Sequence, residues 1–135
     1  MAFTRNPRHP FFQQIDLTSI KEIPFCGEVA SADASAGVEF TLYLQDDVVA
    51  HTLAATEQIL MTDYSISPEV AMQVKITHAT DAAGKRPVNR YCAATGGADR
   101  PLATPYLFPV GVVPKLFGSV ADHIAATIHG VLIQR

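Results

Sequence analysis

The feature that most constrains this chain is an alternation of apolar and polar side chains with a period of two residues. In GVEFTLYLQ, residues 37–45, every even-numbered residue is apolar. In VAMQVKITHA, residues 70–79, the even-numbered residues are four apolar side chains and His78. Because successive side chains of a strand point to opposite faces, this pattern predicts half-buried β-strands.

Three further stretches have the composition of strands: VVAHTL at 48–53, QILMTDYSIS at 58–67 and the closing TIHGVLIQ at 127–134. A turn is predicted in TDAAGKRPVN, residues 80–89, where Asp81 and Gly84 suit it. Six to eight short strands with turn signals between them predict an all-β fold, an antiparallel β-sandwich or jelly roll.

Two segments, 47–61 and 119–128, carry signals for both helix and strand. The first is rich in alanine, and the second has Ser119 and Asp122 at the spacing of a helix capping box. Pairs of β-branched neighbours, such as Val48 with Val49, are stiff in a helix and favour a strand. We expect strands in both segments, and the helix alternative stays open.

The segment TGGADRPLATPYLFPVGVVP, residues 95–114, holds three glycines and four prolines. Proline cannot donate to a sheet ladder, so neither a helix nor a central strand should pass through it. We predict a long structured loop with short edge pieces, held down by apolar residues such as Leu107 and Phe108.

The chain begins with MAFTRNPRHPFFQQ, which carries two arginines and no acidic residue. Its two prolines disfavour helix, so we predict an extended N-terminal arm over residues 1–14, followed by a single β-sandwich domain over residues 15–135. The side chains expected to contact a neighbouring subunit are Arg5, Arg8, Phe11 and Phe12. Arg86 and Arg90 are expected to contact an acidic surface on another protein.

Charged residues make up 17% of the 135 residues, against about 25% in a typical domain. Uncharged surface of this kind is often covered by a partner protein. The formal charge of −3 argues against a nucleic-acid partner. No apolar run approaches the roughly 18 residues that cross a bilayer, so we expect no membrane partner.

The N-terminal sequence lacks the apolar run of a secretory signal. We therefore expect the protein to be made in a reducing cytoplasm and kept there, or built into something assembled there. Cys26 and Cys92 form no C-x-x-C pair. Two free thiols are expected, and a single disulfide between them is the alternative.

Candidate chemistry is sparse. The five histidines include no H-x-H pair, and His123 and His129 would lie about 20 Å apart along one strand. TGGADRP, residues 95–101, could cradle a phosphate, but prolines follow it where a helix N-terminus would be needed. No G-x-S-x-G nucleophile motif occurs. We expect no catalytic residues, no cofactor and no metal site.

The run TLAATEQILMTDYSISPEVAMQVKI, residues 52–76, and the closing ATIHGVLIQR resemble small virion proteins of tailed bacteriophages. That resemblance implies a capsid decoration, or cement, protein: a β-sandwich or jelly roll that sits on the capsid exterior and locks major capsid subunits together. It carries over no functional residues, because no residue defines that class.

The resulting expectation is a non-enzymatic structural protein of a virion, assembled in the host cytoplasm. Its partners would be the major capsid protein and further copies of itself, as a dimer or trimer. One alternative is a small jelly-roll or β-barrel enzyme that acts on a small polar ligand, with histidines lining a cavity. Another is a tail or receptor-binding module, with Tyr43, Tyr64 or Tyr106 clustered in a groove.

Overall fold

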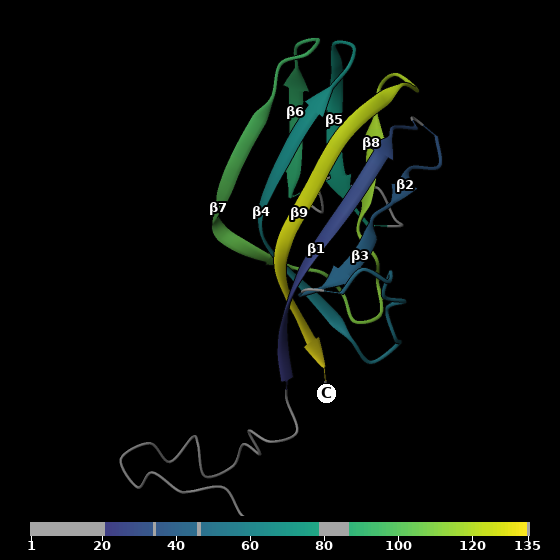
Figure 1. The fold of residues 1–135 in the computed structure, drawn as a ribbon. Helices are drawn as coiled ribbons and strands as arrows, with labels where there is room; N and C mark the ends of the chain where they lie inside the picture. The colour runs from purple at the N-terminus through teal and green to yellow at the C-terminus, as the bar shows by residue number, and fades with distance from the viewer. Residues whose placement is uncertain (1–20, 34, 46, 79–86, 135) are drawn as a thin grey trace, which may run out of the picture.

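The computed structural model describes residues 21–33, 35–45, 47–78 and 87–134 (Figure 1). The predicted arm, with Arg5, Arg8, Phe11 and Phe12, lies outside the described residues, as does Arg86. No helix occurs within these ranges, and so none that is long and apolar enough to cross a membrane. The strands are β1 Lys21–Ser31, β2 Val38–Glu39, β3 Thr41–Leu44, β4 Gln58–Pro68, β5 Met72–Thr77, β6 Val88–Cys92, β7 Ala98–Leu107, β8 Lys115–Gly118 and β9 His123–Gln134.

Two antiparallel sheets pack face to face, which confirms the predicted all-β sandwich (Figure 1). The five-stranded sheet has the order β3-β1-β9-β4-β7, and the four-stranded sheet has the order β2-β8-β5-β6. The space between the sheets is filled with apolar side chains. Those with no exposed surface at all include Ile59, Met61, Val74, Ile76, Phe108, Leu116, Ile128 and Leu132.

The strand pairings are nested in the sequence. With β3 set aside, the first strand pairs with the last, β1 with β9, and the next pair inward is β2 with β8. The series continues with β4 and β7, and then with the hairpin of β5 and β6. An antiparallel ladder nested in this way and rolled into two sheets is a jelly roll, one of the two forms expected from the sequence.

The alternation in residues 37–45 is confirmed, because Phe40 and Leu42 are buried while Glu39 and Thr41 are exposed. The segment nevertheless serves both sheets. It divides at Phe40, whose amide donates to the carbonyl of Pro114, so that β2 joins one sheet and β3 the other. A pattern of period two reports which face is buried, and does not report this change of sheet.

Strand β9 runs through the middle of the five-stranded sheet, between β1 and β4. Ile124, Ile128 and Leu132 point into the core. Between His123 and Ile128 the structure therefore confirms strand. Gly130 lies beside an extra residue of β4, Thr62, where the register shifts. A Cβ at Gly130 would collide with the carbonyl oxygen of Leu60, so this approach of two backbones requires glycine.

The predicted strand over residues 48–53 is wrong, and the strand in 47–61 begins only at Gln58. Before it lies an irregular segment with a single bridge, between Leu42 and His51. Val48 and Val49 are 91% and 75% exposed. β-Branched residues favour strand only where neighbouring strands pack against them, and these two have no such neighbours among the described residues.

The predicted loop over residues 95–114 is also wrong in its first half, where β7 is a ten-residue strand. Pro101 and Pro105 are tolerated because β7 is an edge strand whose outer side needs no donors. Phe108 is fully buried, as expected, whereas Leu107 is 49% exposed and does not hold the segment down.

Candidate functional site

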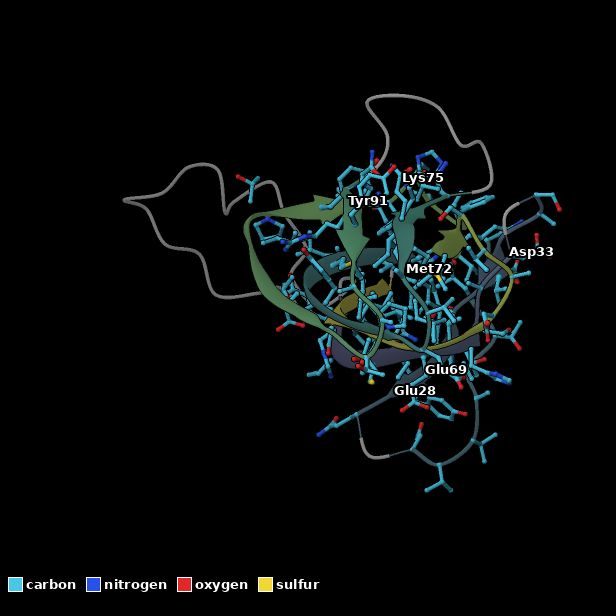
Figure 2. All side chains as sticks on the ribbon, turned by 90° about the horizontal axis from the view of Figure 1, so that it is seen from above. Glu28, Asp33, Glu69, Met72, Lys75 and Tyr91 are labelled. Atoms are coloured by element: carbon cyan, nitrogen blue, oxygen red, sulfur yellow. The ribbon has the colours of Figure 1, made fainter. Side chains whose placement is uncertain are left out.

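The two sheets present outer faces of different chemistry. Figure 2 shows Glu28 on the outside of the five-stranded sheet, Lys75 and Tyr91 on the outside of the four-stranded sheet, and Met72 between the two sheets. The strand registers explain the division. Glu28 alternates along β1 with the buried Phe25-Gly27-Val29 side, and Lys75 alternates along β5 with buried Val74 and Ile76.

Small side chains dominate the outer face of the five-stranded sheet. One row across it joins Thr41, Glu28, Thr127 and Ser65, which lie opposite one another on β3, β1, β9 and β4. Ala30 and Ala125 add two exposed alanines close to this row. Apart from Glu28, the side chains of this row are small and uncharged.

A hollow of about 490 Å³ opens at the edge of this face, where residues of β1, β3 and β9 meet Val38 and Glu39 of β2. Tyr43 and Val38 contribute apolar surface to it, and Glu28 and Glu39 contribute two exposed carboxylates. Within the part of the chain that the structure describes, neither carboxylate forms an ion pair or a side-chain hydrogen bond. The full lining is Glu28, Val29, Ala30, Val38, Glu39, Thr41, Tyr43 and Ile124 to Thr127. This acidic, partly apolar hollow is the candidate contact site.

A second row on the same face contains Tyr43, Cys26, His129 and Asp63. The Nδ1 of His129 lies 3.0 Å from an Asp63 carboxylate oxygen, and both side chains are about half exposed. Partial burial, together with the charges of Glu28 and Asp63, raises the pKa of the Cys26 thiol. A thiol of this kind holds little thiolate at neutral pH, which is unlike a nucleophilic cysteine.

The four-stranded sheet covers one outer aromatic residue, Phe117, and leaves another, Tyr91, 82% exposed. Phe117 lies opposite Lys75 on the outer face, yet it is only 5% exposed. The loop before β2 lies over its ring, because a Cβ at Gly37 would meet three ring carbons at 2.7 to 2.9 Å. Lys75 Nζ adds a cation–π contact 5.7 Å from the ring centroid.

Asp33 shapes that covering loop. Its Oδ1 accepts hydrogen bonds from the amides of Ser35 and Ala36 and from the Ser35 hydroxyl. The hydrogen bond from Ala36 contributes most to lowering the pKa of Asp33, followed by those from Ser35. The carboxylate therefore acts as a turn former, in the manner of an Asx turn.

A buried carboxylate secures the end of the sandwich near the C-terminus. Glu57 is 5% exposed; its two oxygens accept from the Ala54 amide at 2.7 Å and from Gln134 Nε2 at 2.7 Å, and His51 Nε2 lies 2.9 Å away. Burial opposes ionisation, but these three partners outweigh it and lower the pKa of Glu57. These hydrogen bonds connect residues 51–57 to the last strand, so the buried carboxylate has a structural role.

Among the described residues, Glu69, Asp122 and His123 are the group whose donor atoms could approach one metal ion, since these atoms lie within 4.8 Å of one another. His123 Nδ1 is 3.3 Å from Glu69 and 3.5 Å from Asp122. The side chains of His123 and Glu69 are 83% and 65% exposed. Exposed groups at these separations are also typical of a solvated surface ion pair that holds no metal.

The four described histidines lie in different surroundings. His51 contacts Glu57, His123 contacts Glu69 and Asp122, and His129 contacts Asp63. His78 is buried with its ring edge-to-face on Phe108, and its Nε2 has no hydrogen-bond partner. They do not assemble the histidine-lined cavity of the enzyme alternative.

The three tyrosines of the receptor-binding alternative are also apart. Tyr43 lines the acidic hollow, whereas Tyr64 is buried, and Tyr106 packs its ring on Phe108 with centroids 4.8 Å apart. Within the described ranges they form no common groove.

Of the residues predicted to lie at an interface, the structure describes Arg90. It shares the inward side of β6 with Val88 and Cys92, and its Nη1 donates to the Tyr64 hydroxyl at 3.0 Å. That hydrogen bond raises the pKa of Arg90 above its already high value. The guanidinium thus joins the two sheets, and its contact with another protein remains a prediction.

Sequence reasoning did not single out Glu28 or Glu39 as site residues. The alternation places Glu39 outward, but only the pairing of β1 with β3 and β9 brings Glu28 and Tyr43 to one hollow. Both cysteines are free: Cys26 is half-buried and Cys92 is buried, and burial raises the pKa of Cys92 as well.

No family model matches the chain, and no curated protein and no solved structure matches it.

Proposed function

We propose that this protein is a non-enzymatic structural subunit that acts through its surfaces. In its most specific form, it decorates the exterior of a virion capsid and stabilises the lattice by contacting major capsid subunits. The jelly-roll fold alone does not decide this, since the fold serves capsid proteins, lectins and cupin enzymes alike.

The observation that carries the proposal is the contrast between a filled interior and an open outer face. An enzyme that bound its substrate between the two sheets would need a cavity there, whereas here Ile76, Leu116 and Ile128 are fully buried in that space. Outside, the five-stranded sheet offers a row of small side chains beside an acidic hollow. That hollow combines apolar surface from Tyr43 and Val38 with two exposed carboxylates, which suits a partner protein of complementary charge.

The low content of charged residues supports the same role. With 17% charged residues, much of the surface is uncharged. A surface of this kind is tolerated where neighbouring proteins cover it. In the decoration role, the basic N-terminal arm provides a further contact, in which Arg5 and Arg8 reach an adjacent subunit.

Co-sedimentation tests the proposal. An antibody to the purified protein would follow it through a density gradient of lysate from cells that naturally produce it. We expect it in a band of particles whose most abundant protein is a different chain. Recovery of all the protein in the light fractions, as free subunits, would contradict the proposal.

A rebinding experiment tests the role of the arm. Purified protein would be added to particles that have been stripped of it, and the bound fraction compared with that of a variant lacking residues 1–12. The variant should show the wild-type circular dichroism spectrum and lose lattice binding. Full binding by a folded variant would remove the arm from the account.

A further inference from the structure

We infer that the acidic hollow on the five-stranded sheet receives the N-terminal segment, residues 1–20, of a second copy of this chain. The inference rests on the proposed function, because it names one partner of the surface described there. It has three supports: the charge of the hollow, the composition of the segment, and the direction in which the chain enters β1.

The hollow carries negative charge that no described residue neutralises. Glu28 and Glu39 are both exposed, and neither forms an ion pair or side-chain hydrogen bond with a described residue. Their carboxylates flank apolar surface from Val38, Tyr43 and Ala30. A complementary ligand would therefore combine cationic groups with apolar side chains.

The N-terminal segment has that composition. Residues 1–14 include Arg5 and Arg8, three phenylalanines and no acidic residue. Guanidinium groups form strong paired hydrogen bonds with carboxylates. Each phenylalanine that becomes buried removes apolar surface from water, which favours association. The hollow of about 490 Å³ falls in the range of about 300–1,000 Å³ typical of binding sites.

The direction of β1 favours the hollow of a second copy over the chain's own. Lys21 lies opposite Gln134 at the C-terminal end of the sandwich, and Glu28 lies seven residues further along β1 (Figure 1). The chain thus enters β1 about 24 Å from the hollow and already runs toward it. To fill the hollow of its own copy, the segment would have to double back along the sheet, whereas donation to a second copy requires no such reversal.

Length permits the exchange. Twenty residues span at most about 66 to 72 Å when extended, which is more than the distance between neighbouring subunits of this size. Two copies that exchange segments would be related by a twofold axis, with the same contact made twice. Exchange of a terminal segment is a common route to such dimers.

Charge reversal on each side of the contact gives the test. The arm variant is Arg5→Glu with Arg8→Glu, and the hollow variant is Glu28→Lys with Glu39→Lys. Sedimentation velocity of the full chain at low salt should show wild-type protein associated, and each variant alone at least tenfold weaker in association. An equimolar mixture of the two variants should associate again, because each arm then meets a hollow of opposite charge.

The mixture distinguishes the two modes of seating. If each arm occupied the hollow of its own copy, mixing the two variants would not restore association. Only a single chain that carries all four substitutions, on the arm and on the hollow, would then behave as wild type. That outcome, or a wild-type protein that is monomeric at all concentrations, overturns the exchange. Glu22→Lys is the matched control: it makes the same charge change on the same side of β1, six residues from Glu28, and should associate as wild type.

Thermal unfolding of each variant verifies that the exposed substitutions leave the fold intact; should the double hollow variant fail to fold, Glu28→Lys alone replaces it. Failure of the exchange is separable from failure of the proposed function. A wild-type monomer that still bands with particles would refute only the exchange. A wild-type dimer found only in the light fractions would refute only the capsid role.

Discussion

The outer faces of the two sheets meet solvent in different ways. On the four-stranded sheet, an aromatic side chain, Phe117, points outward and the chain covers it with its own loop at Gly37. On the five-stranded sheet, Glu28, Thr41, Ala30 and Ala125 are exposed, with an acidic hollow beside them. The covered Phe117 therefore contributes to stability, whereas the exposed side chains of the five-stranded face can make contacts without loss of stability.

The largest expected effect separates the two faces directly. Phe117→Ala should lower the free energy of unfolding by about 3 to 5 kcal/mol, because it empties a covered site. Tyr43→Ala, on the open face, should lower it by less than about 1 kcal/mol. Urea unfolding followed by circular dichroism measures both. Equal losses would mean that the two faces do not differ as described.

The covering loop gives the next largest effect. Gly37 has a φ of +71°, and a side chain there would press on the ring of Phe117. Gly37→Ala should lower the free energy of unfolding by about 2 to 4 kcal/mol, with about 1 to 2 kcal/mol from the left-handed backbone and about 1 to 2 kcal/mol from the new Cβ pressing on the ring. In a Phe117→Leu background the ring contribution should vanish. A loss unchanged in that background would show that the loop does not press on the ring.

A pH dependence distinguishes a structural carboxylate from an exposed one. The partners of Glu57 lower its pKa in the folded state, so its stabilisation is complete above the unfolded pKa, near 4.3. It is lost as the pH falls through the lower folded value. Glu57→Gln should therefore lower the free energy of unfolding by about 2 kcal/mol at pH 7.

The difference between wild type and Glu57→Gln should shrink toward pH 3, as measured by urea unfolding at a series of pH values. Glu28→Gln is the control on the open face. Its carboxylate accepts no hydrogen bond from a described residue, so we expect a change within about 0.5 kcal/mol at any pH. A pH-independent loss in Glu57→Gln would contradict the assignment.

The smallest effect concerns the pair of His129 and Asp63 on the open face. Both groups are about half exposed, and such pairs contribute from nothing to about 1 kcal/mol. His129→Ala should change the melting temperature by no more than a few degrees. A loss comparable to that of Phe117→Ala would show that this face is needed for the fold.

The fold class could be predicted from the sequence because period-two alternation reports burial directly. It placed Phe40, Leu42 and Ile76 correctly in the core. It failed at Val48 and Val49, where strand propensity had no neighbouring strand to satisfy, and at β7, where an edge position tolerates two prolines. Both failures concern tertiary neighbours, which local composition does not contain.

The candidate site was less predictable for a related reason. Glu28 and Tyr43 are fifteen positions apart in the sequence, and the register between β1 and β3 brings them to one hollow. Register depends on which strands pair, and the nested pairing of a jelly roll is fixed only by the whole chain. The covering of Phe117 by Gly37 has the same origin.

The central claim is that the outer face of the five-stranded sheet is the contact surface. The alkylation rates of the two cysteines test it. Cys26 lies on that face beside Tyr43, and Cys92 is buried. Alkylation by iodoacetamide at pH 8.5 would be followed by mass spectrometry in the dilute purified protein and in the particle band. We predict that Cys26 reacts several-fold more slowly in particles while Cys92 stays slow in both. Equal rates at Cys26 would contradict the account.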